Sequence, residues 1–91
     1  MEDEERPAVA IESAMKHGFT KEEVERAWMC AQGSWRMVRR DKWPPHFMAF
    51  GRIGNRNVEM IAYSTGSRFV IFHAKSPVGA KFKREYKENG R

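Results

Sequence analysis

The sequence predicts a small α+β domain with two N-terminal helices, a three- to four-stranded antiparallel meander sheet and a C-terminal helix. Three observations support this prediction: apolar residues at helical spacing near the N-terminus, short apolar runs separated by turn residues over 35–74, and a helix start signal at residue 76. A chain of 91 residues can bury one hydrophobic core. We therefore expect residues 7–91 to form a single domain, preceded by a disordered acidic tail over residues 1–6.

Residues 7–17 are expected to form the first helix. Pro7 suits a first helical turn, where its missing N–H group is not needed. Gly18 is a typical helix stop, because it adopts the left-handed conformation easily. Between them, apolar residues recur at helical spacing: Ala8, Ile11, Ala14 and Met15.

Residues 20–31 are expected to form the second helix, which has the strongest start signal in the chain. Thr20 can cap the helix while Glu23 reaches back to the Thr20 N–H group. Gly33 follows as a stop, and Cys30 is expected to be a small buried residue of this helix. One apolar stripe runs along it: Val24, Ala27, Trp28 and Ala31.

The sheet is expected to be built around a hairpin of residues 58–63 and 69–74. Residues 47–53 alternate in the manner of a third strand, and the basic segment 35–40 suits an edge strand. Pro44-Pro45 marks a loop between these two strands, because proline cannot sit in a central strand. Short connections favour a meander of consecutive antiparallel strands.

The end of the last predicted strand is the first place to look for chemistry. Strict alternation along a strand places His73 and Lys75 on the same face as Phe69 and Ile71. Polar side chains thus follow an apolar run on one face of the expected hairpin.

The last helix is expected to start at Ser76-Pro77, a cap followed by proline in the first turn, and to end near Asn89-Gly90. Val78, Phe82 and Tyr86 can lie on its inner side. Its other faces are basic and carry Lys81, Lys83, Arg84 and Lys87.

Charge is distributed unevenly along the chain, which has a formal net charge of +5. Residues 1–25 carry eight acids and three bases, a balance of −5, whereas the remaining 66 residues carry fourteen bases and four acids, a balance of +10. A basic surface of this kind attracts RNA or DNA first, or an acidic partner protein. The alternative is a solvated basic face that serves solubility.

Several classes of protein and site are not expected. No apolar stretch approaches the roughly 20 residues of a membrane helix, and the acidic N-terminus is unlike a signal peptide, so we expect a cytoplasmic protein without membrane contact. A single cysteine excludes an internal disulfide and a multi-cysteine zinc site. We expect no metal, because His17, His46 and His73 share no recognised ligand spacing, and no cofactor, because no phosphate-cradling glycine loop appears.

Two sequence motifs, one in each half of the chain, indicate a family. Lys16-His17-Gly18-Phe19-Thr20 precedes Glu22-Glu23, and the string Arg68–Lys75 leads into a basic segment that ends in Arg84-Glu85-Tyr86. Over residues 11–87 this order of elements resembles the BrnT-like toxins of the wider RelE superfamily, and it is also similar to small actinobacterial toxin-like proteins with a Lys-His-Gly element. The resemblance implies the toxin of a toxin–antitoxin module, a metal-independent endoribonuclease that cleaves mRNA, free or bound to the ribosome, and is neutralised by a cognate antitoxin protein.

The resemblance also implies a set of site residues. In such a ribonuclease the 2′-hydroxyl loses a proton, the phosphorane is stabilised, and the 5′-oxygen gains a proton. Arg68 and Lys75 would hold the phosphate, His73 would be general base or acid, Tyr86 would be acid, base or stacking surface, and His17 would lie near the same edge. Further basic residues would hold the RNA backbone: Lys81, Lys83, Arg84, Arg52 and Arg56.

Each assignment has an alternative. His73 can be a partly buried histidine satisfied by its neighbours, Tyr86 can anchor the last helix, and His17 can be only a helix-end residue. The whole protein can be a non-enzymatic module that binds nucleic acid or protein.

Two tryptophans beside basic residues are candidates for partner binding. Trp35 and Trp43 can stack on bases or dock the antitoxin. Alternatively they close the edge of the sheet, or pair with a second copy of the chain in a homodimer.

Overall fold

The computed structural model describes residues 7–39 and 41–89, so the expected tail over residues 1–6 lies outside the described residues. The elements in chain order are β1 (Ala8–Ala10), the 3-10 helix η1 (Glu12–Met15), α1 (Lys21–Cys30), the 3-10 helix η2 (Gln32–Ser34), β2 (Arg36–Arg39), β3 (His46–Ile53), β4 (Arg56–Ser64), β5 (Phe69–Lys75) and α2 (Ala80–Asn89).

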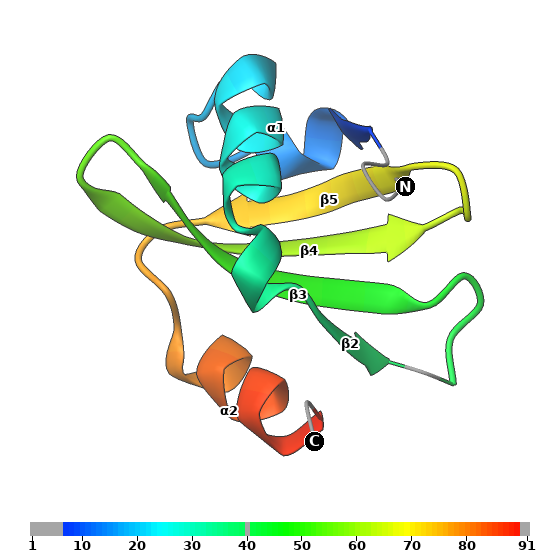
Figure 1. Ribbon diagram of the computed structural model, residues 1–91. Coiled ribbons are helices and arrows are strands. Elements are labelled where there is room, and N and C mark those ends of the chain that lie inside the picture. Colours follow the sequence, from blue (N-terminus) through cyan, green and yellow to red (C-terminus); the bar gives the residue numbers. More distant parts are fainter. Residues whose placement is uncertain (1–6, 40, 90–91) are drawn as a thin grey trace.

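Five strands form one mixed sheet in the order β1-β5-β4-β3-β2 (Figure 1). Strands β2 to β5 are consecutive and antiparallel, whereas β1 pairs in parallel with β5. Helix α1 lies against one face of the sheet and α2 against the other. The expected sheet of three or four antiparallel strands is therefore wrong, because a parallel edge strand was missed.

The predicted first helix is also wrong. Residues 8–10 form β1, and only the short helix η1 follows it. The Phe69 N–H group donates to the Pro7 carbonyl at 2.9 Å and the Ile11 N–H group to the Ile71 carbonyl at 3.0 Å. Backbone groups at the edge of β5 need partners, and this long-range pairing outweighs the local preference for a helix. Ile11 is 39% exposed, so it is not part of a buried stripe.

The predicted second helix agrees with α1 to within one residue at each end. The Glu23 N–H group donates to Thr20 Oγ1 at 3.1 Å, and the Thr20 N–H group donates to Glu23 Oε1 at 2.9 Å, which completes the expected capping box. Cys30, however, is exposed, so its expected burial is wrong. It lies at the last residue of α1, beyond the buried positions Val24, Ala27 and Trp28.

Two hydrophobic cores lie on the two faces of the sheet. The first, beneath α1, contains Trp28 and Phe69, both fully buried. The second, beneath α2, is smaller and consists of Val38, Met48, Ile61 and Phe82, with partly buried neighbours including Phe50 and Tyr86. Each helix therefore has its own core, and the sheet separates them.

A β-bulge in β5 changes the face to which its last residues belong. Ala62 pairs with Ile71, but its neighbour Ile61 pairs with His73, which leaves Phe72 as an extra residue. Ala74 is consequently buried in the first core together with Ile71, and His73 turns to the α2 side. The expectation that His73 and Lys75 share a face with Phe69 and Ile71 is wrong, because a bulge breaks strict alternation.

The last helix begins later than expected. Residues 76–79 connect β5 to α2, which starts at Ala80 and ends at Asn89. Among the described residues, none of the helices has the length and apolar character needed to cross a membrane.

Candidate functional site

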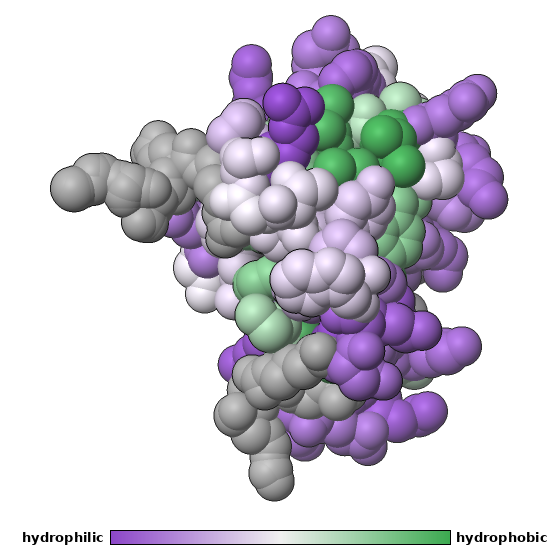
Figure 2. All heavy atoms as spheres, turned by 90° about the vertical axis from the view of Figure 1, so that its right-hand side faces the viewer, coloured by the Kyte–Doolittle hydropathy of each residue, from purple (hydrophilic) through white to green (hydrophobic). Residues whose placement is uncertain are grey.

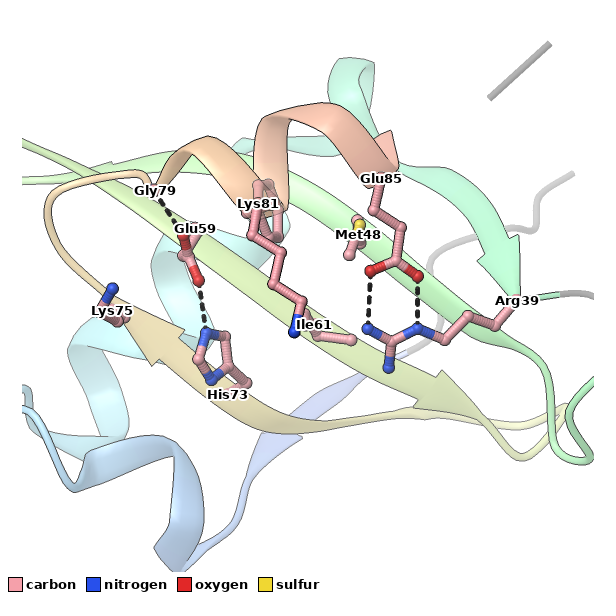
Figure 3. A pocket seen from close by; sticks show the side chains of 10 residues that line it. Arg39, Met48, Glu59, Ile61, His73, Lys75, Gly79, Lys81 and Glu85 are labelled. Atoms are coloured by element: carbon pink, nitrogen blue, oxygen red, sulfur yellow. Dashed lines mark hydrogen bonds and ion pairs between the residues drawn. The ribbon is translucent and has the colours of Figure 1, made fainter. Parts of the chain in front are cut away.

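A pocket of about 280 Å³ lies between α2 and the sheet, at the end of β5 (Figure 3). Residues of β2, β3, β4, β5 and α2 contribute to it, as does the connection before α2. Its lining residues are Arg39, Met48, Glu59, Ile61, His73, Lys75, Gly79, Lys81, Phe82 and Glu85.

Glu59 and His73 form a close pair in this pocket. Glu59 is only 6% exposed, and its Oε2 lies 2.6 Å from His73 Nε2. Its other oxygen, Oε1, accepts a hydrogen bond from the Gly79 N–H group at 2.8 Å. A buried carboxylate is costly without such partners, so these two contacts explain how the pocket holds it.

The geometry of the pair assigns the roles of the two imidazole nitrogens. An ionised carboxylate only accepts hydrogen bonds, so the tautomer of His73 that fits this contact with ionised Glu59 carries its proton on Nε2. In the neutral imidazole, Nδ1 is then the basic nitrogen. The His73 side chain is 29% exposed, which leaves the ring accessible from the pocket.

Two lysines add positive charge beside this pair. Lys75 is paired with Glu59 across β4 and β5, and Lys81 projects from α2 over the pocket (Figure 3). A Cβ atom added to Gly79 would lie 3.5 Å from Glu59 Oε1 and 3.8 Å from Lys75 Nζ, so both side chains border Gly79. Imidazole, carboxylate and two ammonium groups therefore share one small volume.

An ion pair between Arg39 and Glu85 closes the other end of the pocket. Arg39 Nε and Nη2 donate to the two Glu85 carboxylate oxygens at 2.7 and 2.9 Å, which ties α2 to β2. These hydrogen bonds lower the pKa of Glu85 and raise the pKa of Arg39. Arg39 Nη1 also lies 3.1 Å from His46 Nδ1, and burial, with the charges of Arg39 and Lys42, lowers the pKa of His46.

The sequence interpretation missed Glu59, Arg39 and Glu85 as pocket residues. The sequence does contain a signal for Glu59, since it is the one charged residue inside the apolar run 58–63. A carboxylate buried in a strand usually has a specific partner. The Arg39–Glu85 pair joins residues 46 positions apart, and no local pattern identifies such a contact.

His73, Lys75 and Lys81 are the expected site residues that the fold brings into the pocket. His17 lies next to it, because its ring centroid is 6.3 Å from that of His73, in an edge-to-face arrangement. His17 is exposed.

Arg68 and Tyr86 are not brought to His73 in the way the resemblance implies. Arg68 is exposed in the turn before β5, whereas His73 is near the other end of that strand, roughly 16 Å away at the usual rise per residue. The Tyr86 hydroxyl donates to the Ser34 carbonyl at 2.7 Å, and Arg36 lies over its ring at 4.3 Å. Tyr86 therefore anchors α2, the alternative that the sequence left open.

The other basic residues predicted to bind RNA are spread over several surfaces. Lys83 lines a separate hollow with Phe50 and Asn57, and Arg52 lines another beside Cys30. Arg56 lies over the Phe19 ring at 4.9 Å, on the α1 side, while Arg84 is exposed on α2. The surface around α2 is strongly hydrophilic, whereas hydrophobic residues gather above it (Figure 2).

The two candidate partner-binding tryptophans have different environments. Trp35 stacks on Trp28 with ring centroids 5.5 Å apart, and its Nε1–H group donates to the Trp28 carbonyl at 2.9 Å. Trp43 is 90% exposed in the connection between β2 and β3. Trp35 thus belongs to the core, and Trp43 is available to a partner.

Within residues 7–39 and 41–89, no three His, Cys, Asp or Glu side chains gather as a metal site would require. The pocket combines a carboxylate, an imidazole and cationic side chains. Comparison of the chain with protein-family models, with curated proteins and with solved structures finds no match.

Proposed function

We propose that the protein is a metal-independent endoribonuclease whose active site is the pocket between α2 and the sheet. The observation that carries this proposal is the contact of 2.6 Å between His73 and the buried Glu59, beside Lys75 and Lys81. These are the group types that phosphodiester cleavage needs: a base, an orienting carboxylate and cations for the phosphate.

The reaction assigns one role to each group. Nδ1 of His73 takes the proton of the 2′-hydroxyl, and the 2′-oxygen attacks the phosphorus to form a 2′,3′-cyclic phosphate. The bond between phosphorus and the 5′-oxygen breaks, and the 5′-oxygen takes a proton from His17, whose ring lies 6.3 Å from that of His73. Lys75 and Lys81 stabilise the charge of the phosphorane.

Glu59 is a positioning residue in this mechanism. It accepts the Nε2–H hydrogen bond, which fixes the tautomer of His73 and the orientation of its ring. The Gly79 N–H group holds the carboxylate in place from the other side.

The sequence resemblance extends this proposal to a biological role. The protein would be the toxin of a toxin–antitoxin module in the cytoplasm, acting on mRNA that is free or bound to the ribosome. A cognate antitoxin would mask the basic pocket. Trp43 supports this part of the proposal, because an exposed tryptophan is a typical anchor for a partner protein.

The test is cleavage of RNA by the purified protein in EDTA, with and without ribosomes. We expect products ending in a 2′,3′-cyclic phosphate, unchanged by EDTA, and a loss of about 10²- to 10⁴-fold in His73→Ala. Arg26→Ala removes one exposed positive charge from α1, on the other face of the sheet, and is the matched control. Cleavage that needs a divalent metal, or that survives His73→Ala, contradicts the proposal.

A second candidate is a binding module without catalysis. The same contacts of Glu59 with His73 and Gly79 also form a structural clasp between β4, β5 and the start of α2. RNA or an acidic protein would then bind the basic surface uncleaved. Tight binding without any cyclic-phosphate product would favour this candidate.

A further inference from the structure

An aromatic cluster lies on the sheet face that carries the pocket. His46, Tyr63 and Phe72 come from the neighbouring strands β3, β4 and β5, and His46 and Tyr63 are paired residues. The rings of Tyr63 and Phe72 are stacked with centroids 6.0 Å apart and an interplanar angle of 30°, and the His46 ring lies 5.2 Å from that of Phe72.

All three rings are partly exposed. Strands β4 and β5 extend past α2 toward the turn that joins them (Figure 1). Helix α2 covers the second core, and Phe72 is one of the partly buried residues packed against that core. The cluster is therefore at the margin of that core, where an aromatic face can still meet a ligand.

The bulge in β5 connects this cluster to the proposed active site. Phe72 is the extra residue of the bulge, so Phe72 and the next residue, His73, both lie on the α2 side of the sheet. Consecutive Cα atoms are about 3.8 Å apart. A nucleotide whose phosphate meets His73 and the lysines can therefore place its base against the Phe72 ring.

We propose that Phe72, Tyr63 and His46 form a stacking subsite for an unpaired base of single-stranded RNA, whose backbone phosphate is held by Lys75 and Lys81. This inference rests on the proposed function for the phosphate position. Stacking on aromatic rings next to a cationic groove is how proteins bind single strands, because every base has an aromatic face. The bases of a duplex are stacked on one another and are not accessible in this way.

Binding is tested with a 2′-O-methyl oligonucleotide that carries 2-aminopurine and has no 2′-hydroxyl to attack. We expect the full-length protein to bind the single strand at least tenfold more tightly than the duplex of the same sequence. Quenching of the 2-aminopurine fluorescence should accompany binding, because the base stacks on protein rings. Equal affinity for single strand and duplex would overturn the inference.

The variants Phe72→Leu and Tyr63→Leu separate stacking from charge. Each should weaken single-strand binding roughly tenfold and reduce the quenching, in the range typical of one lost stacking contact. Phe47→Leu is the matched control, since Phe47 is also partly exposed and follows His46 in β3, but belongs to the core on the other face. Two variants are used so that failure of one to fold leaves the other informative. Affinity and quenching that are unchanged in Phe72→Leu and Tyr63→Leu would overturn the inference.

This experiment does not depend on catalysis. If the wild type cleaves RNA but Phe72→Leu binds the probe as tightly as the wild type, the stacking subsite is contradicted and the proposed function is not. If the wild type never cleaves RNA but both variants show the expected loss of binding, the ribonuclease mechanism is contradicted and the subsite is not. A DNA probe of the same sequence distinguishes RNA from single strands in general: equal binding of DNA would overturn the restriction to RNA.

Discussion

The Glu59 carboxylate accepts a hydrogen bond from the Gly79 N–H group at 2.8 Å, which ties the buried acid of the pocket to the residue immediately before α2. The same carboxylate contacts His73 through its other oxygen. The orientation of the imidazole is therefore coupled to the position at which the chain enters α2.

Replacement of Glu59 by glutamine separates the structural role of this carboxylate from its chemical role. In Glu59→Gln the amide oxygen can still accept from Gly79, but the amide nitrogen donates to Nε2 of His73 and favours the wrong tautomer. We expect stability to change by less than about 1 kcal/mol, while kcat falls about 100-fold or more at unchanged KM. Single-turnover cleavage and urea unfolding measure the two effects.

Glu59→Ala is the comparison for that variant. It leaves the Gly79 N–H group without its acceptor and should cost about 1–3 kcal/mol of unfolding free energy. If Glu59→Gln lowers stability as much as Glu59→Ala and leaves kcat unchanged, the carboxylate is only a structural clasp.

Gly51 lets α1 approach β3 closely. A Cβ atom there would lie 2.5 Å from Met60 Cε and 3.3 Å from the Ala27 carbonyl oxygen, and Met60 is fully buried. We expect Gly51→Ala to lower the unfolding free energy by about 1–3 kcal/mol, because the added methyl group overlaps the buried Met60 side chain and presses on the Ala27 carbonyl of α1. Denaturant unfolding measures the loss.

Gly33→Ala is the matched control, since an added Cβ at Gly33 meets nothing within 4 Å. That variant should keep the wild-type stability or gain a few tenths of a kcal/mol. Equal losses in the two variants would show that contact with α1 is not the cause.

Local signals were sufficient to predict several elements. The capping box of Thr20 and Glu23 located α1, because both hydrogen bonds form within one helical turn. The apolar runs with turn residues between them located β4 and β5 as an antiparallel hairpin. Such patterns act over a few residues, and tertiary contacts reinforced them here.

Features that depend on distant residues were not predicted. Strand β1 exists because the edge of β5, about sixty residues later, needs backbone partners. The bulge at Phe72 depends on the register between β4 and β5, and it moved His73 to the other face of the sheet. His73 and Lys75 therefore line one pocket, but on the face of the sheet opposite to the expected one.

Substitution of the two tryptophans considered for partner binding should change stability by very different amounts. Trp43→Ala should change stability by less than about 0.5 kcal/mol, because the side chain is 90% exposed. Trp35→Ala should cost about 3 kcal/mol, because it removes the stacking on Trp28 and the tilted ring contact with Phe69. Thermal unfolding of both variants checks the difference, and a large loss in Trp43→Ala would contradict it.

The Arg39–Glu85 ion pair should make stability depend on pH in the acid range. Hydrogen bonds from Arg39 lower the pKa of Glu85 below its ordinary value of 4.5 in the folded chain. Glu85 therefore stabilises the fold above that ordinary pKa, and the contribution is lost as the pH falls through the lowered folded-state pKa. We expect Glu85→Gln to be less stable than the wild type at neutral pH and to approach wild-type stability in acid.

Urea unfolding at a series of pH values measures the difference in unfolding free energy. Glu88→Gln removes the same charge from an exposed position of α2 and controls for net charge. The opposite result is a difference in unfolding free energy between the wild type and Glu85→Gln that stays constant down to strongly acid pH. That result would show that the ion pair does not stabilise the contact between α2 and β2.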